Sequence, residues 1–166
     1  MSGHPARDML IRFDDWPHYS RTQYSAYSVL PILSMRPNML LGGKENMSQS
    51  ASQASSFYKE VADTKKVWTL RDYGGFPAPM NSEGKRSQPF WSSLSRVQKI
   101  INDVSAYSSF EPVEISWEDF SKKWVPGLSH EGVLVGVNWS GSRATGYDIE
   151  PETIRENVES YIATEY

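Results

Sequence analysis

Apolar side chains recur at helical spacing in four stretches of the chain. In the first, Phe57, Tyr58 and Val61 follow Ala54 at i+3, i+4 and i+7, which places them on one face of a helix. The other stripes consist of Leu94, Val97, Ile101 and Val104, of Trp117, Phe120 and Trp124, and of Ile154, Val158, Tyr161 and Ile162. Capping serines are available for the first three helices (Ser50 or Ser52, Ser92 or Ser93, and Ser116), and Pro151 suits the first turn of the last. The pattern predicts four amphipathic helices, the third ending at Pro126-Gly127.

Short β-prone runs lie between these helices. They cover residues 67–70, 76–80, 88–91 and 113–115, and two prolines confine the second run to a sheet edge. Val133, Val135, Val137 and Trp139 then alternate with other residues, and a turn at 140–142 leads into a returning run at 143–149. This last arrangement predicts a β-hairpin.

The order of these elements predicts an α+β fold. We expect a mostly antiparallel sheet of about five short strands, with the helices packed on one side. A length of 166 residues fits one domain. We therefore expect residues 47–166 to form a single α+β domain.

Residues 1–46 differ from the rest of the chain. They show neither helical nor alternating periodicity, and four prolines interrupt them. Two interpretations stay open: an unstructured tail, or an extension that is not part of the natural protein. We favour the second, because codons for Gly42-Gly43-Lys44-Glu45 can spell a purine-rich ribosome-binding site directly before Met47. The test is the nucleotide sequence, where pyrimidine-rich codons would remove this support.

Composition limits the chemistry that the chain can carry. It has no cysteine, which excludes disulfides, thiolate zinc sites and cysteine nucleophiles. Its three histidines are His4, His18 and His130, and His130 lacks a serine, cysteine or second histidine as a partner for general base catalysis. We therefore expect no metal and no cofactor.

Charge is distributed unevenly along the chain. The formal net charge is −3. Residues 47–110 carry 8 basic and 5 acidic side chains, whereas residues 111–166 carry 4 basic and 11 acidic ones. An acidic last third disfavours nucleic acid as a partner, and no run is long and apolar enough to span a bilayer. We expect a cytoplasmic protein that binds neither nucleic acid nor membrane.

Two tryptophans are candidates for a binding groove. Most tryptophans of such a domain belong to the core, each with its indole N–H donating to a backbone carbonyl. Trp91 is the expected exception, because it lies at a strand-to-helix junction, where clefts commonly form. Trp68 and Arg71, which ends the same predicted strand, complete this candidate set.

A second candidate is an anion site beside the first. Ser92 and Ser93 lead into a helix whose first backbone N–H groups are free, and Lys85 and Arg86 precede the same strand. A carboxylate or phosphate fits such a corner. An ordinary serine cap explains the same residues, and the run lacks the glycines of a phosphate-binding loop.

A hydrolase built on Arg71, Asp72 and Glu114 is the least favoured possibility. Arg71 and Asp72 have the sequence of a surface turn pair. The neighbouring acids Glu118 and Asp119 are explained by their place at a helix start. We therefore lean towards a protein without enzymatic activity.

Several motifs together resemble a known family. They are Val67-Trp68-Thr69-Leu70, Gln88-Pro89-Phe90-Trp91-Ser92-Ser93, the spacing W-x-x-F-x-x-x-W-x-P-G-L from Trp117 to Leu128, and the run from Gly132 to Asn138. From Phe57 to Ile162 the chain resembles a bacterial family of domains of unknown function, number 2750. The resemblance implies a small cytoplasmic domain with the boundaries given above, and it adds nothing about chemistry. A fainter likeness links it to immunity proteins of toxin systems.

These observations lead to two expectations about function. The first is a protein-binding module, an immunity-like protein or a regulatory adaptor, with a groove near Trp91 and an acidic flank on the last helix. The alternative is a small-molecule sensor that binds an anion at Lys85, Arg86 and Ser92. We expect a monomer or a homodimer.

Overall fold

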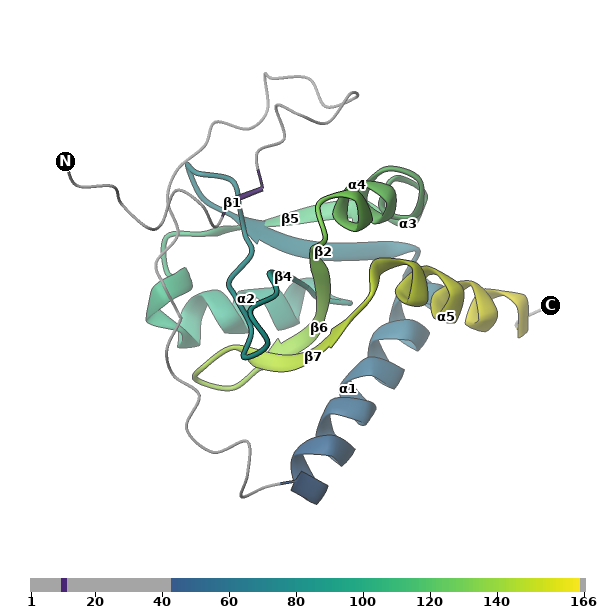
Figure 1. Cartoon of the computed structure of the whole chain (residues 1–166), viewed down its shortest axis with the longest axis horizontal. Helices are drawn as coiled ribbons and strands as arrows, with labels where there is room; N and C mark the ends of the chain where they lie inside the picture. The colour runs from purple at the N-terminus through teal and green to yellow at the C-terminus, as the bar shows by residue number, and fades with distance from the viewer. Residues whose placement is uncertain (1–9, 12–42, 165–166) are drawn as a thin grey trace.

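The computed structural model describes residues 10–11 and 43–164, with side chains from Ala51 onwards (Figure 1). Its elements are β1 Leu10–Ile11, α1 Gly43–Thr64, β2 Lys66–Arg71, β3 Phe76–Pro77, β4 Ser87–Phe90, α2 Leu94–Asp103, the 3-10 turn η3 Ser105–Tyr107, β5 Glu111–Ser116, α3 Trp117–Asp119, the π-helical segment η4 Phe120–Trp124, α4 Val125–His130, β6 Leu134–Ser140, β7 Thr145–Ile149 and α5 Pro151–Thr164. The predicted helices correspond to α1, α2, the run from α3 to α4, and α5.

The strands form small sheets that pair in both directions. β2 and β5 are antiparallel over six positions, from Lys66↔Ser116 to Arg71↔Glu111. β6 lies between β4, which is parallel to it, and β7, which is antiparallel to it. The predicted α+β class and the predicted hairpin are therefore confirmed. Instead of the expected continuous, mostly antiparallel sheet, the strands form small separate sheets, one of which contains a parallel pair.

A single backbone pair joins the two larger sheets. The Trp68 N–H donates to the Trp91 carbonyl and the Trp91 N–H donates to the Trp68 carbonyl, both at 2.7 Å. In an antiparallel ladder only every second residue uses its backbone groups to bond the partner strand, which explains why the Trp68 backbone is free to pair with Trp91. The Trp117 N–H donates to the Lys65 carbonyl, which sets the alternation of the ladder. The backbone N–H and C=O groups of the odd-numbered residues of β2 point to β5, and those of the even-numbered residues point away from it. The Thr69 hydroxyl adds a hydrogen bond of 2.9 Å to the Pro89 carbonyl.

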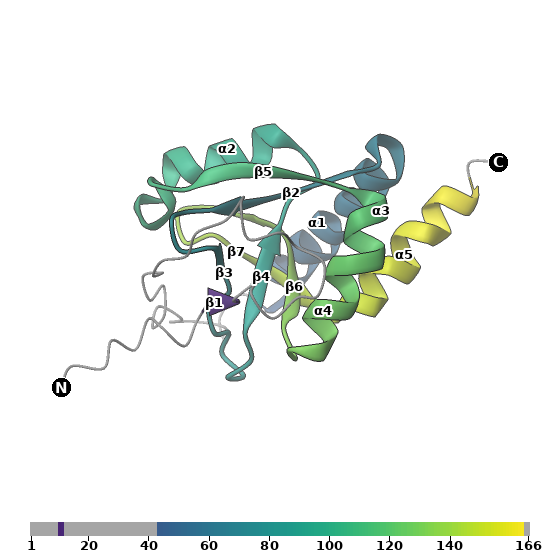
Figure 2. The same ribbon diagram turned by 90° about the horizontal axis from the view of Figure 1, so that it is seen from above.

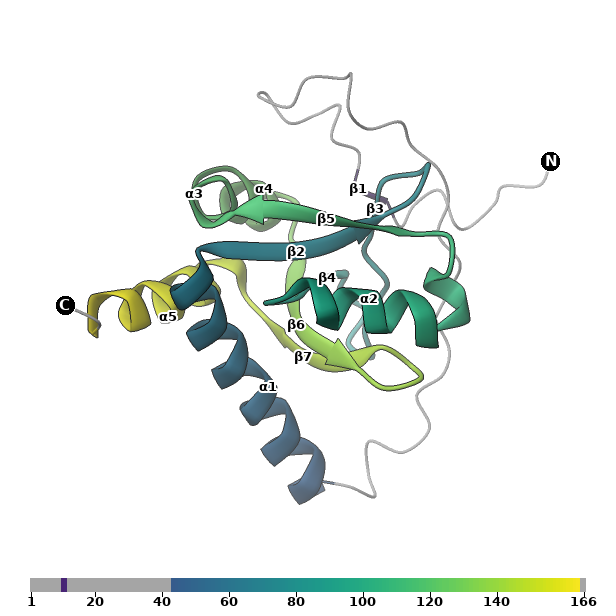
Figure 3. The ribbon, with the colours of Figure 1, turned by 180° about the vertical axis from the view of Figure 1, so that it is seen from behind.

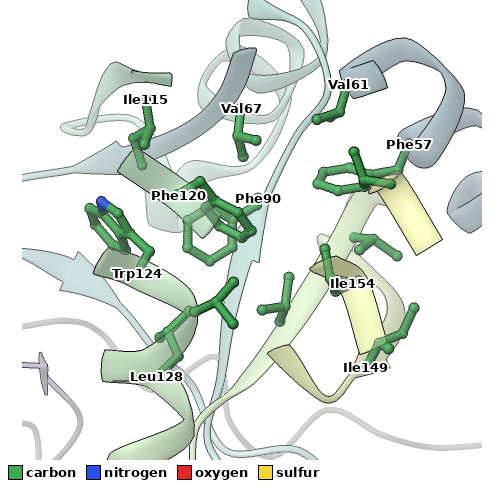
Figure 4. Close-up of a cluster of buried hydrophobic side chains, with 14 of the residues drawn as sticks. Phe57, Val61, Val67, Phe90, Ile115, Phe120, Trp124, Leu128, Ile149 and Ile154 are labelled. Atoms are coloured by element: carbon green, nitrogen blue, oxygen red, sulfur yellow. The ribbon is translucent and has the colours of Figure 1, made fainter. Parts of the chain in front are cut away.

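β2 also separates two hydrophobic clusters. Successive strand residues point to opposite faces, and Val67 belongs to the first cluster whereas Leu70 belongs to the second. The first and larger cluster lies beneath α1, α4 and α5 (Figure 4). The second lies beneath α2 and contains Trp91 and Trp139. Helices thus cover both faces of β2, with α2 placed apart from α4 and α5 (Figures 2 and 3).

Trp139 departs from the predicted alternation. In a regular strand its side chain would share a face with Val135 and Val137. A register shift lies between Val137 and Ser140, and Asn138 has a φ of 47°. This irregularity turns Trp139 into the second cluster, while the two valines remain in the first. The prediction of one common face for these residues is wrong, because side chains after a bulge point to the opposite side of the sheet from where regular alternation would place them.

The helix that begins after Ser116 continues past Pro126. The Asp119 N–H donates to Ser116 Oγ at 3.1 Å, which confirms the predicted cap. The π-helical segment then leads into α4, which has Pro126 in its first turn. Pro126 lies just after the π-helical segment, where the regular i→i−4 hydrogen-bond pattern is interrupted, so the helix tolerates the missing N–H. The predicted helix end at Pro126-Gly127 is therefore wrong.

The start of α1 also differs from the prediction. The helix begins at Gly43, so Ser50 and Ser52 lie inside it and do not cap it. The predicted boundary between residues 46 and 47 falls within this helix. Before it, the structure describes β1, which pairs with β3. Most of the predicted N-terminal extension lies outside the described residues, and its origin stays a prediction.

Replacing Gly136 by alanine is expected to destabilise the protein. The indole of Trp139 lies against Gly136 and Gly146, and a Cβ added to Gly136 would lie 2.3 Å from Trp139 Cε2. Such overpacking costs about 1–3 kcal/mol, which urea unfolding should show as a lower midpoint. The control is Ser142→Ala in the exposed turn of the same hairpin, expected within about 0.5 kcal/mol of the wild type. Equal midpoints for the two variants would contradict this packing.

Candidate functional site

Of the two predicted tryptophans, Trp91 lies inside the protein at the junction between β4 and α2, and Trp68 lies on β2. The Trp91 side chain is 0% exposed, and its Nε1–H donates to the Trp139 carbonyl at 2.8 Å. Trp68 is half-buried and packs against the same second cluster. The expectation that Trp91 is exposed is therefore wrong. Its backbone pairs with β2, and this pairing directs the indole into the core.

Ser92 is part of a polar network at this junction. Its backbone N–H donates to Asn138 Oδ1 at 2.9 Å, and its hydroxyl donates to Glu60 Oε2 at 2.5 Å. The Asn138 amide in turn donates to the Gln53 carbonyl at 3.4 Å. We call Gln53, Glu60, Ser92, Arg96 and Asn138 the junction network. It links α1, the start of α2 and the bulge of β6.

Arg96 supplies the charge that balances Glu60. Its Nη2 and Nε lie 2.7 Å and 3.2 Å from the two carboxylate oxygens of Glu60, a two-pronged arrangement that favours the ionised form. Burial acts to raise the pKa of Glu60, but the hydrogen bonds from Arg96 and Ser92 and the charge of Arg96 outweigh it, so the pKa lies below its usual value. The carboxylate is therefore engaged and ionised at neutral pH.

The predicted anion corner is not assembled. Lys85 and Arg86 precede β4 whereas Ser92 and Ser93 follow it. Six residues of extended chain span roughly 20 Å. Lys85 Nζ lies 4.0 Å from Glu150 Oε1. The Ser92 N–H already donates to Asn138 Oδ1. The structure thus brings the serines to the junction network and leaves the two basic residues at the other end of the strand.

Ser93 begins α2 without the expected side-chain cap. It is the N-cap residue, but its hydroxyl lies 3.1 Å from the Ser95 hydroxyl and bonds no backbone N–H of the first turn. The predicted cap by Ser93 is therefore wrong. Ser92 does not replace it, because its hydroxyl is directed to Glu60.

Arg71, Asp72 and Glu114 do not converge on one point. Arg71 Nη2 lies 3.7 Å from Glu111 Oε2 at one end of the β2–β5 ladder. Glu114 Oε2 lies 3.1 Å from Lys66 Nζ, towards the opposite end. Asp72 accepts the Gly74 N–H at 2.6 Å in the turn after β2. Burial raises the pKa of Asp72, and backbone hydrogen bonds oppose the rise. These contacts place the three side chains in a ladder and a turn, with no shared reactive centre.

Sequence reasoning missed four members of the junction network: Gln53, Glu60, Arg96 and Asn138. Gln53 and Glu60 lie on the polar side of the first stripe, where solvent exposure was the natural expectation. A signal existed at Asn138, a polar residue within an otherwise apolar strand. It is 2% exposed, and a buried amide needs partners.

The outer face of α5 carries the predicted acidic flank. Its exposed residues include Thr153, Glu156, Glu159 and Ser160. Glu152, on the same helix, forms a 2.6 Å ion pair with Arg155. Among the described residues no ion pair is formed by Glu156 or Glu159. Two carboxylates therefore face solvent without a counter-charge from any described residue.

Two further observations concern metal binding and membrane helices in the described residues. Within residues 10–11 and 43–164, no group of three or more histidine, aspartate or glutamate side chains is arranged to hold a metal ion. None of the helices in this part of the chain has the length and apolar character needed to cross a membrane.

Replacing Glu60 by glutamine is expected to lower stability at neutral pH by about 1 kcal/mol, because the ion pair is partly exposed. The pKa of Glu60 in the folded protein lies below its unfolded value of 4.5. The stabilising contribution of the ionised carboxylate is therefore complete above pH 4.5 and is lost as the pH falls through the folded pKa. Urea unfolding between pH 7 and pH 3 should show the difference between wild type and Glu60→Gln shrinking below about pH 4.5.

The matched control for this experiment is Asp103→Asn. Asp103 forms an exposed ion pair with Lys99 on α2, and its loss should change stability by at most about 0.5 kcal/mol at any pH. A pH-independent difference for Glu60→Gln would contradict the account of the junction network.

Comparison with known proteins agrees with the resemblance seen in the motifs. The model of a family described as protein of unknown function, DUF2750, matches residues 54–158. The match contains every strand from β2 to β7 and the backbone pair between Trp68 and Trp91. No curated protein and no solved structure matches the chain. Since the family model covers more than half of the sequence, the chain belongs to the DUF2750 family.

Proposed function

We propose that this chain is a non-enzymatic protein-binding domain that recognises its partner through the outer face of α5. It acts in the bacterial cytoplasm as a regulatory adaptor or an immunity-like protein. It works as a monomer or a homodimer, with neither nucleic acid nor membrane as its partner.

The observation that carries this proposal is the pair of uncompensated carboxylates on α5. Glu156 and Glu159 are exposed and form no ion pair with a described residue. Like charges on one helix face disfavour folding slightly, and a partner of opposite charge removes that penalty. Complementary charge also accelerates association and selects between partners.

The contacts of three other carboxylates support binding over chemistry. Glu60 is held by Arg96, Glu114 by Lys66, and Asp72 by the Gly74 N–H. A general acid or base must reach a substrate proton, and these carboxylates are already engaged. The exposed surface of a rigid domain is then the part available for recognition.

The test is site-specific photo-crosslinking in bacterial cells. A photoreactive residue in place of Ser160, on the outer face of α5, is expected to give one dominant protein adduct. The same residue in place of Ser142, in the exposed β6–β7 turn, serves as the control and should not give that adduct. The proposal fails if position 160 yields no adduct, or if both positions yield the same set.

A further inference from the structure

Gln88, on β4, is a polar side chain buried in the interior of the protein. It is 0% exposed, and neither its Nε2 nor its Oε1 has a hydrogen-bond partner within the part of the chain that the structure describes. A carboxamide carries two N–H donors and an oxygen that can accept two hydrogen bonds. Buried polar atoms in folded proteins nearly always have partners. This amide therefore needs a partner from outside the chain.

The side chains beside Gln88 are apolar. Val135 is its partner in the parallel ladder with β6. On the other side of β4, Met80 pairs with Arg86, and the same antiparallel register places Ala78 opposite Gln88. Val135 and Ala78 both belong to the first cluster. The amide thus lies against the first cluster, where a polar group without a hydrogen bond is costly.

Prolines remove backbone donors from the strand pairing beside Gln88. The Ser87 N–H donates to the Pro79 carbonyl at 2.9 Å, on the side of β4 that faces away from β6 (Figure 2). In a regular antiparallel pair the opposite residue returns this bond, but Pro79 has no N–H. Further along the same register Pro77 lies opposite Pro89, and both lack the N–H as well. The Ser87 carbonyl, next to Gln88 in the chain, therefore receives no ladder hydrogen bond from Pro79.

We propose that Gln88 binds an internal water molecule at this proline-interrupted pairing. The water accepts a hydrogen bond from Gln88 Nε2, and its own hydrogens serve the acceptors beside it, Gln88 Oε1 and the Ser87 carbonyl. Buried waters typically make about three such hydrogen bonds to polar groups that lack other partners. The site is independent of the proposed partner surface on α5.

Water fits this site better than other small occupants. An ion brings charge among apolar side chains, and burying a charge costs far more than burying a neutral group. Ca²⁺ and Mg²⁺ take about six or more oxygen ligands, carboxylates among them, whereas the polar groups here are a carboxamide and a backbone carbonyl. An apolar molecule would leave the amide without a hydrogen bond. Water is neutral and small, and it both donates and accepts.

The test is an NMR measurement of contacts between water and side-chain amides in the full chain. The Gln88 amide protons are expected to give cross peaks to water with opposite NOE and ROE signs, as for a water that tumbles with the protein. Exchange of protons with solvent gives equal signs and is thereby distinguished. Gln98, exposed on α2, is the matched control in the same spectrum and should give no such peaks. The proposal is overturned if the Gln88 amide is observed without these peaks, or if Gln98 gives the same ones.

Replacing Gln88 by methionine tests the same site through stability. Methionine is an unbranched side chain of similar length without the amide. If water bonds the amide, Gln88→Met loses those hydrogen bonds, and the urea midpoint should lie at or below the wild-type value. If the amide has no partner at all, its removal relieves an unsatisfied polar group. The midpoint would then rise, which overturns the proposal. Gln98→Met is the control, expected to leave the midpoint unchanged.

Discussion

The two hydrogen bonds between Trp68 and Trp91 are the constraint on which the rest of the structure depends. They join the β2–β5 ladder to the sheet of β4, β6 and β7, at the only bridge described between these ladders. Both tryptophan side chains contact the second cluster, and β2 sends Val67 into the first. This backbone pair therefore lies where the two hydrophobic clusters adjoin.

Polar contacts beside the Trp68–Trp91 pair reinforce it. Ser92 follows Trp91 directly, and its hydrogen bonds to Asn138 and Glu60 tie α1 and β6 to the start of α2. α1 is thereby held over the first cluster, where it packs against α5. Fixed packing suits a recognition surface, because side chains that are already in place bind without a further loss of entropy. Such packing supports the proposed role in binding.

Local signals in the sequence predicted much of the fold and little of the candidate site. The Ser116 cap, the stripes of α2 and α5, and the β6–β7 hairpin follow from nearest-neighbour chemistry. The burial of Trp91 arises from pairing with β2, which is far away in sequence, so no local pattern reports it. The reversal of Trp139 arises from the register shift of the β6–β7 hairpin at Asn138, which simple alternation does not reveal. Glu60 and Arg96 are 36 residues apart, so their ion pair had no local signal either.

Hydrogen exchange at the Trp68 and Trp91 amides tests the central claim most directly. If this pair joins the two clusters, both amides exchange only through global unfolding, and their opening free energy equals that measured by denaturant unfolding. The Thr69 amide, on the side of β2 that faces β5, provides the comparison within the same strand. Exchange of Trp68 and Trp91 at an opening free energy well below the global value would contradict the account, because the two clusters would then separate without unfolding.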